Sequence, residues 1–256
     1  MKKKLKINKD KNIGKVVFLV EGDSTEPELI RHIFTNIFDY KTVQYDKRSN
    51  EIKKYESKKN KYSQVFVIPL QHPQINQISG SKTYIDDVIA KLKHDNFFLD
   101  ILNSAVYLVF DRDRVCNKKA DIIPCLEKYT NSRDNGEEEN GLLLISYPSI
   151  EAYIMNSYGK TNKFCNGSQI KKFLIDNNLK IVEMKKDNVL NATEFLLKSI
   201  DTICPQKYKE IYLDNLKEIN ISIFSKEERE YGKNKNYTTL SLFAISFLDL
   251  GLISFD

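Results

Sequence analysis

The sequence predicts an α/β fold in which a mainly parallel four-stranded sheet is followed by a mostly helical C-terminal region. Four apolar runs support this prediction, because they lack the polar alternation of half-exposed strands and so indicate strands buried on both faces. The runs are residues 16–20, 65–70, 105–110 and 142–145. Helical patterns separate them, and such alternation is typical of a three-layer α/β domain with right-handed crossovers.

Each expected helix has its own signal. Pro27 stands in a first helical turn, where proline is tolerated, and apolar residues at helical spacing continue from it to residue 37. A second stripe covers 84–92, behind a candidate capping box. A third helix is expected near 120–130.

The second half of the chain has a different pattern. After Gly159 the continuous apolar runs stop, and helical stripes such as 170–174 and 195–200 take their place. We therefore expect one domain at 1–158, with a basic N-terminal arm, and a mostly helical domain at 159–256.

Composition narrows the class of protein. With 256 residues, 41% apolar and 29% charged, the chain can bury a substantial core, which excludes a disordered tail or a disulfide-stapled miniature domain. No apolar run approaches the roughly 18 residues of a membrane span, and the lysine-rich start lacks the long apolar segment of an export signal. We therefore expect a cytoplasmic protein without membrane contacts. The four cysteines are too far apart for a zinc site or a disulfide framework.

Basic residues gather in two segments. The net charge is +5, yet residues 1–15 carry seven Lys and residues 46–62 carry six Lys and one Arg, so the rest of the chain is acidic. Lysines interleaved with tyrosines suit a nucleic-acid backbone, because cations release counterions there and rings stack on bases. The lysines expected to bind nucleic acid are Lys53, Lys54, Lys58 and Lys59. The alternative is that these segments are solvated loops.

Carboxylates follow three of the four expected strands. They are Glu21 and Glu26 after the first, Asp111 and Asp113 after the third, and Glu151 after the fourth. Ligands of open α/β sheets bind at the carboxyl ends of the strands, so we expect these side chains in one crevice. Crowded carboxylates repel one another unless a cation neutralises them. The expected cofactor is Mg²⁺ or Mn²⁺, which prefers oxygen ligands and acts on phosphates.

The order of these motifs resembles the TOPRIM domain shared by topoisomerases, bacterial primases and several nucleases, which carries a Glu in its first strand-turn and Asp-x-Asp after a later strand. Residues 20–27 (VEGDSTEP) look like the Glu-Gly-x-x-Thr-Glu-Pro opening of RloB-like proteins, which are related to the OLD nucleases. Residues 146–151 (SYPSIE) are similar to the Ser-Asn-Pro-Cys-Phe-Glu segment of that group. The similarity reaches to about residue 158. The cysteine spacing excludes a zinc-binding primase, and the short chain excludes a topoisomerase, which leaves a nuclease.

The resemblance implies a TOPRIM-like Rossmannoid domain and a metal-dependent endonuclease, a hydrolase of phosphodiester bonds that acts in bacterial antiviral defence against phage, as in abortive infection. By this resemblance Glu21 is the general acid/base or a metal-bridging ligand, and one or two Mg²⁺ ions are held by Glu26, Asp111, Asp113 and Glu151. The implied partners are nucleic acid, with RNA (tRNA included) slightly favoured over DNA, and an ATPase of the ABC/SMC-like type. A homo-oligomer stays open.

Cations near the scissile phosphate would stabilise the charge that develops there, and the candidates are Arg112, Arg114 and Lys185.

Two alternatives to a TOPRIM nuclease stay open. One is a TOPRIM-shaped binding subunit that docks to an ATPase and does not cleave. The other is a restriction-like core built on Asp176, Glu183 and Lys185, but this short signal sits among helical stripes.

Overall fold

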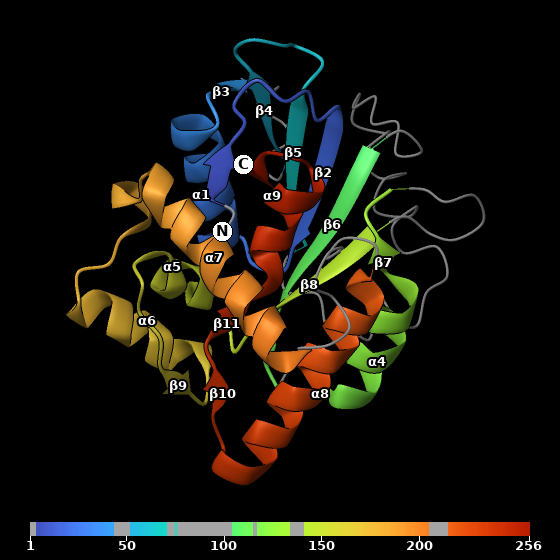
Figure 1. The fold of residues 1–256 in the computed structure, drawn as a ribbon, viewed down its shortest axis with the longest axis vertical. Coiled ribbons are helices and arrows are strands. Elements are labelled where there is room, and N and C mark those ends of the chain that lie inside the picture. Colours follow the sequence, from blue (N-terminus) through green and yellow to red (C-terminus); the bar gives the residue numbers. More distant parts are fainter. Residues whose placement is uncertain are drawn as a thin grey trace.

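The four apolar runs form the parallel centre of one sheet (Figure 1). The computed structural model describes residues 4–43, 52–70, 75, 104–114, 117–133, 141–204 and 215–256, and within it the four runs are adjacent strands in the order β5-β2-β6-β8. Their bounds are β2 Lys15–Val20, β5 Gln64–Pro69, β6 Ser104–Asp111 and β8 Gly141–Tyr147. All seven residues of β8 are buried, as expected of a strand covered on both faces. The α/β fold class is therefore confirmed.

The sheet extends beyond this centre and is mixed. Among the described residues it has eight strands, because four short strands join it in antiparallel pairing. These are β3 (Tyr40–Val43), β4 (Lys53–Ser57), β7 (Thr130–Asn131) and β11 (Leu240–Ser241). The predicted count of four strands covers only the parallel centre, since the added strands are two to five residues long and contain no continuous apolar run.

Helices follow the strands where the apolar stripes predict them. The helix after β2 is α1 (Thr25–His32), which continues as a π-helical turn over Ile33–Ile37. The helix after β6 is α4 (Lys119–Lys128), and the helix after β8 is α5 (Glu151–Ser157). The helix expected at 84–92 lies outside the described residues.

The described part of the chain after Gly159 is mostly helical, as predicted. Its helices are α6 (Gly167–Asp176), α7 (Lys186–Ile203), α8 (Leu216–Asn234) and α9 (Ile245–Asp249). Its short strands, besides β11, are β9 (Lys163–Phe164), β10 (Tyr237–Thr238) and β12 (Ile253–Phe255). The division at 158/159 stays a prediction, and the structure adds that both segments contribute to one sheet and one buried core.

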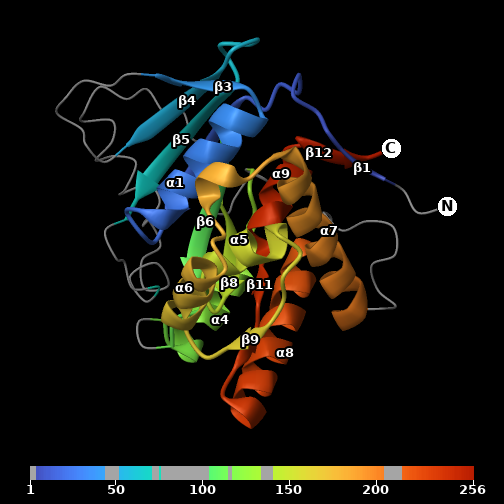
Figure 2. The same cartoon turned by 90° about the vertical axis from the view of Figure 1, so that its left-hand side faces the viewer.

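The two ends of the described chain lie together. Strand β12 pairs antiparallel with β1 (Leu5–Ile7), and Figure 2 shows both ends side by side beyond α7. The Asp256 backbone N–H donates to the Lys4 carbonyl over 2.8 Å, which extends the ladder by one residue. The basic N-terminal arm is therefore tied to the C-terminal segment.

A group of buried rings fastens the C-terminal segment to the sheet. Phe18 of β2 lies 5.1 Å from Tyr107 of β6 and 5.8 Å from Phe243, measured between ring centroids. Phe243 in turn lies 5.2 Å from Tyr153 of α5. Burying each of these side chains stabilises the fold by about 1.5–3 kcal/mol. These contacts join β2, β6 and α5 to the turn that carries Phe243.

None of the described helices is long and apolar enough to cross a membrane. The cysteines in the described ranges, Cys125, Cys165 and Cys204, are free thiols. Cys116 lies outside these ranges.

Candidate active site

The ends of three parallel strands bring the predicted acidic residues to one edge of the sheet. Val20, the last residue of β2, is level with Val109 of β6, and Asp111 at the end of β6 is level with Ser146 of β8. The backbone N–H of Glu21 donates to the Val109 carbonyl over 3.2 Å. Hydrogen bonding therefore continues from the strands into the loops that carry the carboxylates.

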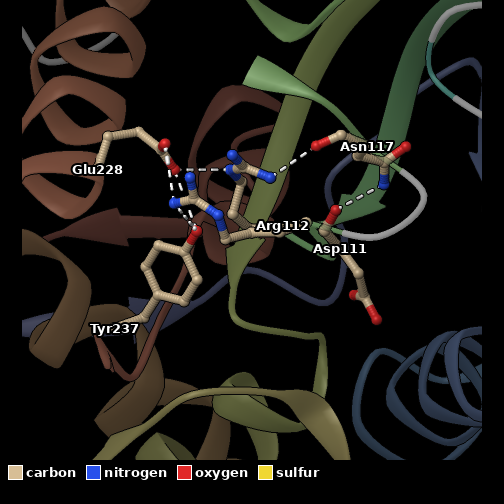
Figure 3. A network of polar contacts seen from close by, with 6 residues as sticks. Asp111, Arg112, Asn117, Glu228 and Tyr237 are labelled. Carbon is tan, nitrogen blue, oxygen red and sulfur yellow. Dashed lines mark hydrogen bonds and ion pairs between the residues drawn. The ribbon is translucent and has the colours of Figure 1, made fainter. Parts of the chain in front are cut away.

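Glu21 is fixed by the loop after β6. Its Oε2 accepts the Asp111 backbone N–H at 2.8 Å, and its Oε1 accepts the Asn117 side-chain amide at 3.3 Å. The same amide donates to the Asp111 carbonyl at 2.9 Å, as Figure 3 shows. Asn117 is fully buried, and the sequence analysis missed it. It joins the loops that follow β2 and β6.

Glu26 folds back onto the turn before its own helix. Its Oε1 accepts the Gly22 backbone N–H at 3.2 Å, and only 6% of the residue is exposed. A Cβ atom at Gly22 would lie 2.5 Å from Glu26 Oε2, which is closer than real contacts allow. Gly22 is therefore required for this placement, because a larger residue would displace the carboxylate.

Asp111 and Glu151 meet where β8 leads into α5. Asp111 Oδ1 accepts the Ile150 backbone N–H at 2.8 Å. Glu151 is 3% exposed, and its Oε1 lies 3.4 Å from the ammonium group of Lys171 on α6. Its Oε2 is buried without a hydrogen-bond partner among the described residues. An unpaired buried carboxylate oxygen is costly, and it is the kind of atom that a cation would satisfy.

The carboxylates raise one another's pKa values. Burial, with smaller contributions from the charges of Glu26 and Asp113, raises the pKa of Glu21 to about 7 against the hydrogen bonds described above. Burial, and then the charges of Glu26, Glu151 and Glu21, hold the pKa of Asp111 well above its usual value. Burial and the charge of Glu151 also raise the pKa of Glu26. The positive charge near the edge therefore does not offset the burial and mutual repulsion of these three carboxylates.

The carboxylate oxygens at this edge suit a hard divalent cation, although in the described residues they are not already arranged around one point as metal ligands. The carboxylates of Glu21, Glu26 and Asp111 are each turned onto a backbone N–H instead. Mg²⁺ and Mn²⁺ prefer such oxygen atoms, so an ion would have to compete with these donors.

A cavity of about 340 Å³ opens beside this edge. Its walls carry three of the carboxylates, Asp111, Asp113 and Glu151, together with the cations Arg114 and Lys171. Both signs of charge in one cavity suit a metal ion together with an anionic ligand. Lys171 was not predicted, because its nearness to Glu151 depends on how α6 packs beside α5.

Nucleic-acid binding by Arg112 stays a prediction, and in the structure its guanidinium is already paired within the chain. The residue is only 1% exposed. Its Nε donates to Glu228 Oε1 of α8 at 2.8 Å and its Nη1 to the Asn117 carbonyl at 2.7 Å (Figure 3). Its guanidinium therefore has a loop carbonyl and a buried carboxylate as partners, and the residue also lines the cavity. Arg112 joins α8 to the loop that carries Asp111.

Arg114 differs from its neighbour because it reaches the surface. Its side chain is 40% exposed, and its Nη1 lies 3.2 Å from Glu228 Oε2. Its guanidinium covers the ring of Tyr231 at 4.3 Å from the ring centroid. As part of the cavity wall it stays a candidate contact for nucleic acid.

Two lysines of the predicted basic segment, Lys58 and Lys59, lie away from the carboxylates. They follow β4, next to the start of β5, at the top of Figure 1, whereas Glu21 follows the other end of the parallel strands. A strand of this length spans roughly 20 Å, so one phosphate cannot touch both groups. Lys58 pairs with Asp39 at 2.7 Å, and Lys59 pairs with Asp10.

Lys53 and Lys54 belong to β4 itself, and the ammonium of Lys54 lies 5.3 Å from the ring centroid of Phe66. Nucleic-acid binding by these lysines stays a prediction. The restriction-like alternative gains no support, since Ile181–Glu183 form an exposed 3₁₀ turn rather than a buried strand.

Comparisons of the chain with protein-family models, with curated proteins and with solved structures find no match. The resemblance to TOPRIM nucleases therefore stays a prediction that rests on the residues themselves.

Titration of Glu21 gives a first prediction. Because its pKa is raised from 4.5 to about 7 by folding, the folded state binds more protons in this range, and the free energy of unfolding falls as pH rises through it. In metal-free buffer, Glu21→Gln should therefore be more stable than the wild type at pH 8 by about 2 kcal/mol, and much less so near pH 5. Urea denaturation at both pH values measures this. The exposed Asp23→Asn is the control, and an equal gain there would contradict the assignment.

The ion pair between Arg112 and Glu228 of α8 gives a second prediction. Glu228→Ala leaves the buried Arg112 guanidinium without its counter-charge, so the free energy of unfolding should fall by about 3–5 kcal/mol. Glu218→Ala on the exposed side of the same helix is the matched control and should change it by less than about 0.5 kcal/mol. Equal losses for both variants would show that the pair does not support the loop.

Proposed function

We propose that the chain is a metal-dependent nuclease that cleaves phosphodiester bonds of nucleic acid with Mg²⁺ or Mn²⁺. One observation supports this most directly: carboxylates from three separate loops gather at the carboxyl edge of the parallel strands, where burial and nearby negative charge raise the pKa values of Glu21, Glu26 and Asp111. Such a set is costly for the fold unless it serves a cation. The adjoining cavity, with Arg114 and Lys171 in its walls, offers room for a phosphate.

In this proposal, Asp111, Asp113 and Glu151 hold the ion from the cavity wall, with Glu21 and Glu26 adjoining them. When bound, the ion supplies Lewis-acid stabilisation of the phosphate charge and lowers the pKa of an attacking water or hydroxyl group. The raised pKa of Glu21 lets it hold or release a proton near neutral pH, which suits a general acid/base. Arg114 and Lys171 attract and orient the phosphate.

The biological setting follows from the resemblance. We propose that the substrate is RNA, tRNA included, slightly ahead of DNA, and that the protein is a bacterial anti-phage effector controlled by an ATPase of the ABC/SMC-like type. The positions of Glu21, Asp111 and Glu151 on one edge support the motif order on which this resemblance rests.

A separate observation favours a second candidate function. Because no ready ligand cage exists in the described ranges and three of the carboxylates accept backbone N–H groups, the edge also suits a binding subunit that docks to an ATPase without cleaving. Under this alternative the carboxylates serve to hold the loops together.

Cleavage by variants decides between the two, and it is the third prediction. Purified protein is titrated with Mg²⁺ against mixed tRNA, single-stranded DNA and duplex DNA. Glu21→Gln and Asp111→Asn should lower the cleavage rate by at least about 100-fold, because each loses a charge that holds the ion or moves a proton. Both changes keep the side-chain size, and circular dichroism checks that the fold is intact.

Asp23→Asn, in the exposed part of the same loop, should keep wild-type cleavage. Equal cleavage in EDTA would exclude the metal mechanism. Binding of nucleic acid with no cleavage by the wild type under any metal would favour the docking subunit.

A further inference from the structure

Helix α6 begins at the cavity. Asn166 caps the helix, and its side chain accepts the Gln169 backbone N–H at 3.1 Å. The N–H groups of Gly167 and Ser168 precede that cap bond and have no intrahelical acceptor, as at every helix start. Asn166, Gly167 and Ser168 all form part of the cavity wall. The positive end of the helix dipole therefore faces the space beside the carboxylates.

A buried hydroxyl without a partner lies against this helix start. Ser149 is 3% exposed, its Oγ has no hydrogen-bond partner among the described residues, and it too lines the cavity. A Cβ atom placed on Gly167 would lie 2.8 Å from that Oγ, so the hydroxyl and the first helical residue are in direct contact. Buried hydroxyl groups are normally hydrogen-bonded, and an unpaired one calls for an explanation. An acceptor from outside the chain would supply one.

Two cations complete the wall. Lys171 lies four residues after Gly167, one turn into α6, and its Nζ is 3.4 Å from Glu151 Oε1. Arg114 reaches the same cavity, held over the ring of Tyr231. A helix start, a hydroxyl, an ammonium and a guanidinium together match an oxyanion that accepts several hydrogen bonds.

We propose that this part of the cavity binds one phosphate group of a nucleic-acid strand, held by the start of α6, Ser149, Lys171 and Arg114. That the phosphate belongs to nucleic acid rests on the proposed function. The carboxylates in the same wall repel a phosphate unless a cation stands between them, so binding depends on the divalent ion. A cavity of about 340 Å³ suits a single nucleotide, so the strand enters unpaired.

Adenosine 5′-monophosphate is the probe, and adenosine, which lacks the phosphate, is its control. Isothermal titration of the full chain with Mg²⁺ should show saturable binding of the monophosphate only, and EDTA should abolish it. Lys171→Gln should weaken binding about tenfold or more, because a charge-assisted hydrogen bond is lost. Lys172→Gln, the exposed neighbour on α6 outside the cavity wall, removes the same charge and should leave the affinity unchanged.

Two more variants separate binding from folding. Ser149→Ala should weaken monophosphate binding about threefold or more yet leave the melting temperature of the free protein unchanged or higher, because it removes an unpaired buried hydroxyl. Gly167→Ala should also weaken binding, since its methyl group would collide with Ser149 Oγ. Gly232→Ala on α8, where nothing lies within 4 Å of the added atom, is its matched control.

The outcomes also separate this inference from the proposed nuclease. If the protein cleaves nucleic acid but binds adenosine monophosphate and adenosine with equal affinity, the phosphate site is wrong and the proposed nuclease activity is unaffected. Equal affinities of the Lys171 and Lys172 variants would overturn it as well. If Lys171→Gln weakens monophosphate binding but the wild type cleaves no nucleic acid, the phosphate site is supported and the proposed nuclease activity is excluded.

Discussion

Crowding of buried negative charge at one edge of the sheet is the constraint on which the rest of the site depends. The parallel pairing of β2, β6 and β8 places the ends of three strands side by side, so the carboxylates that follow them cannot avoid one another. The described residues satisfy them only in part: a backbone N–H binds each of Glu21, Glu26 and Asp111, while Glu151 has one ammonium and, among these residues, one oxygen without a partner. Buried charges with too few hydrogen bonds or counter-charges lower the stability of the folded state. A bound divalent cation would restore that stability, because it neutralises the carboxylates.

The C-terminal segment stabilises this edge without neutralising it. Arg112 and Arg114 stand in sequence beside Asp111 and Asp113, yet both pair with Glu228 of α8. The single carboxylate of Glu228 offsets part of their charge, and the loop gains an attachment to α8. Helix α6 adds the ammonium of Lys171 and a helix start on another part of the cavity wall. The helical half of the chain thus supports the acidic loop and supplies the groups that suit an anion.

Much of this arrangement could be predicted from the sequence, because local pattern determines it. Continuous apolar runs identify the parallel strands, and the segments that follow three of these runs contain Glu21, Asp111 and Glu151, which is why these residues could be predicted to lie at one edge. The place of Arg112 could not be predicted, since its partner Glu228 is 116 residues away and an Arg between two Asp residues resembles a solvated loop. The short antiparallel strands, Asn117 and Lys171 were missed for the same reason: only tertiary packing gives them their partners.

The most direct test of the account is to locate the ion itself. Crystals of the full chain grown with Mn²⁺, with diffraction recorded at the manganese absorption edge, would show any bound ion as an anomalous peak. The account predicts a peak between the carboxylates of Asp111 and Glu151, with Lys171 displaced from Glu151, and no such peak in crystals of Asp111→Asn. Well-ordered crystals saturated with Mn²⁺ that show no peak at this edge would contradict it.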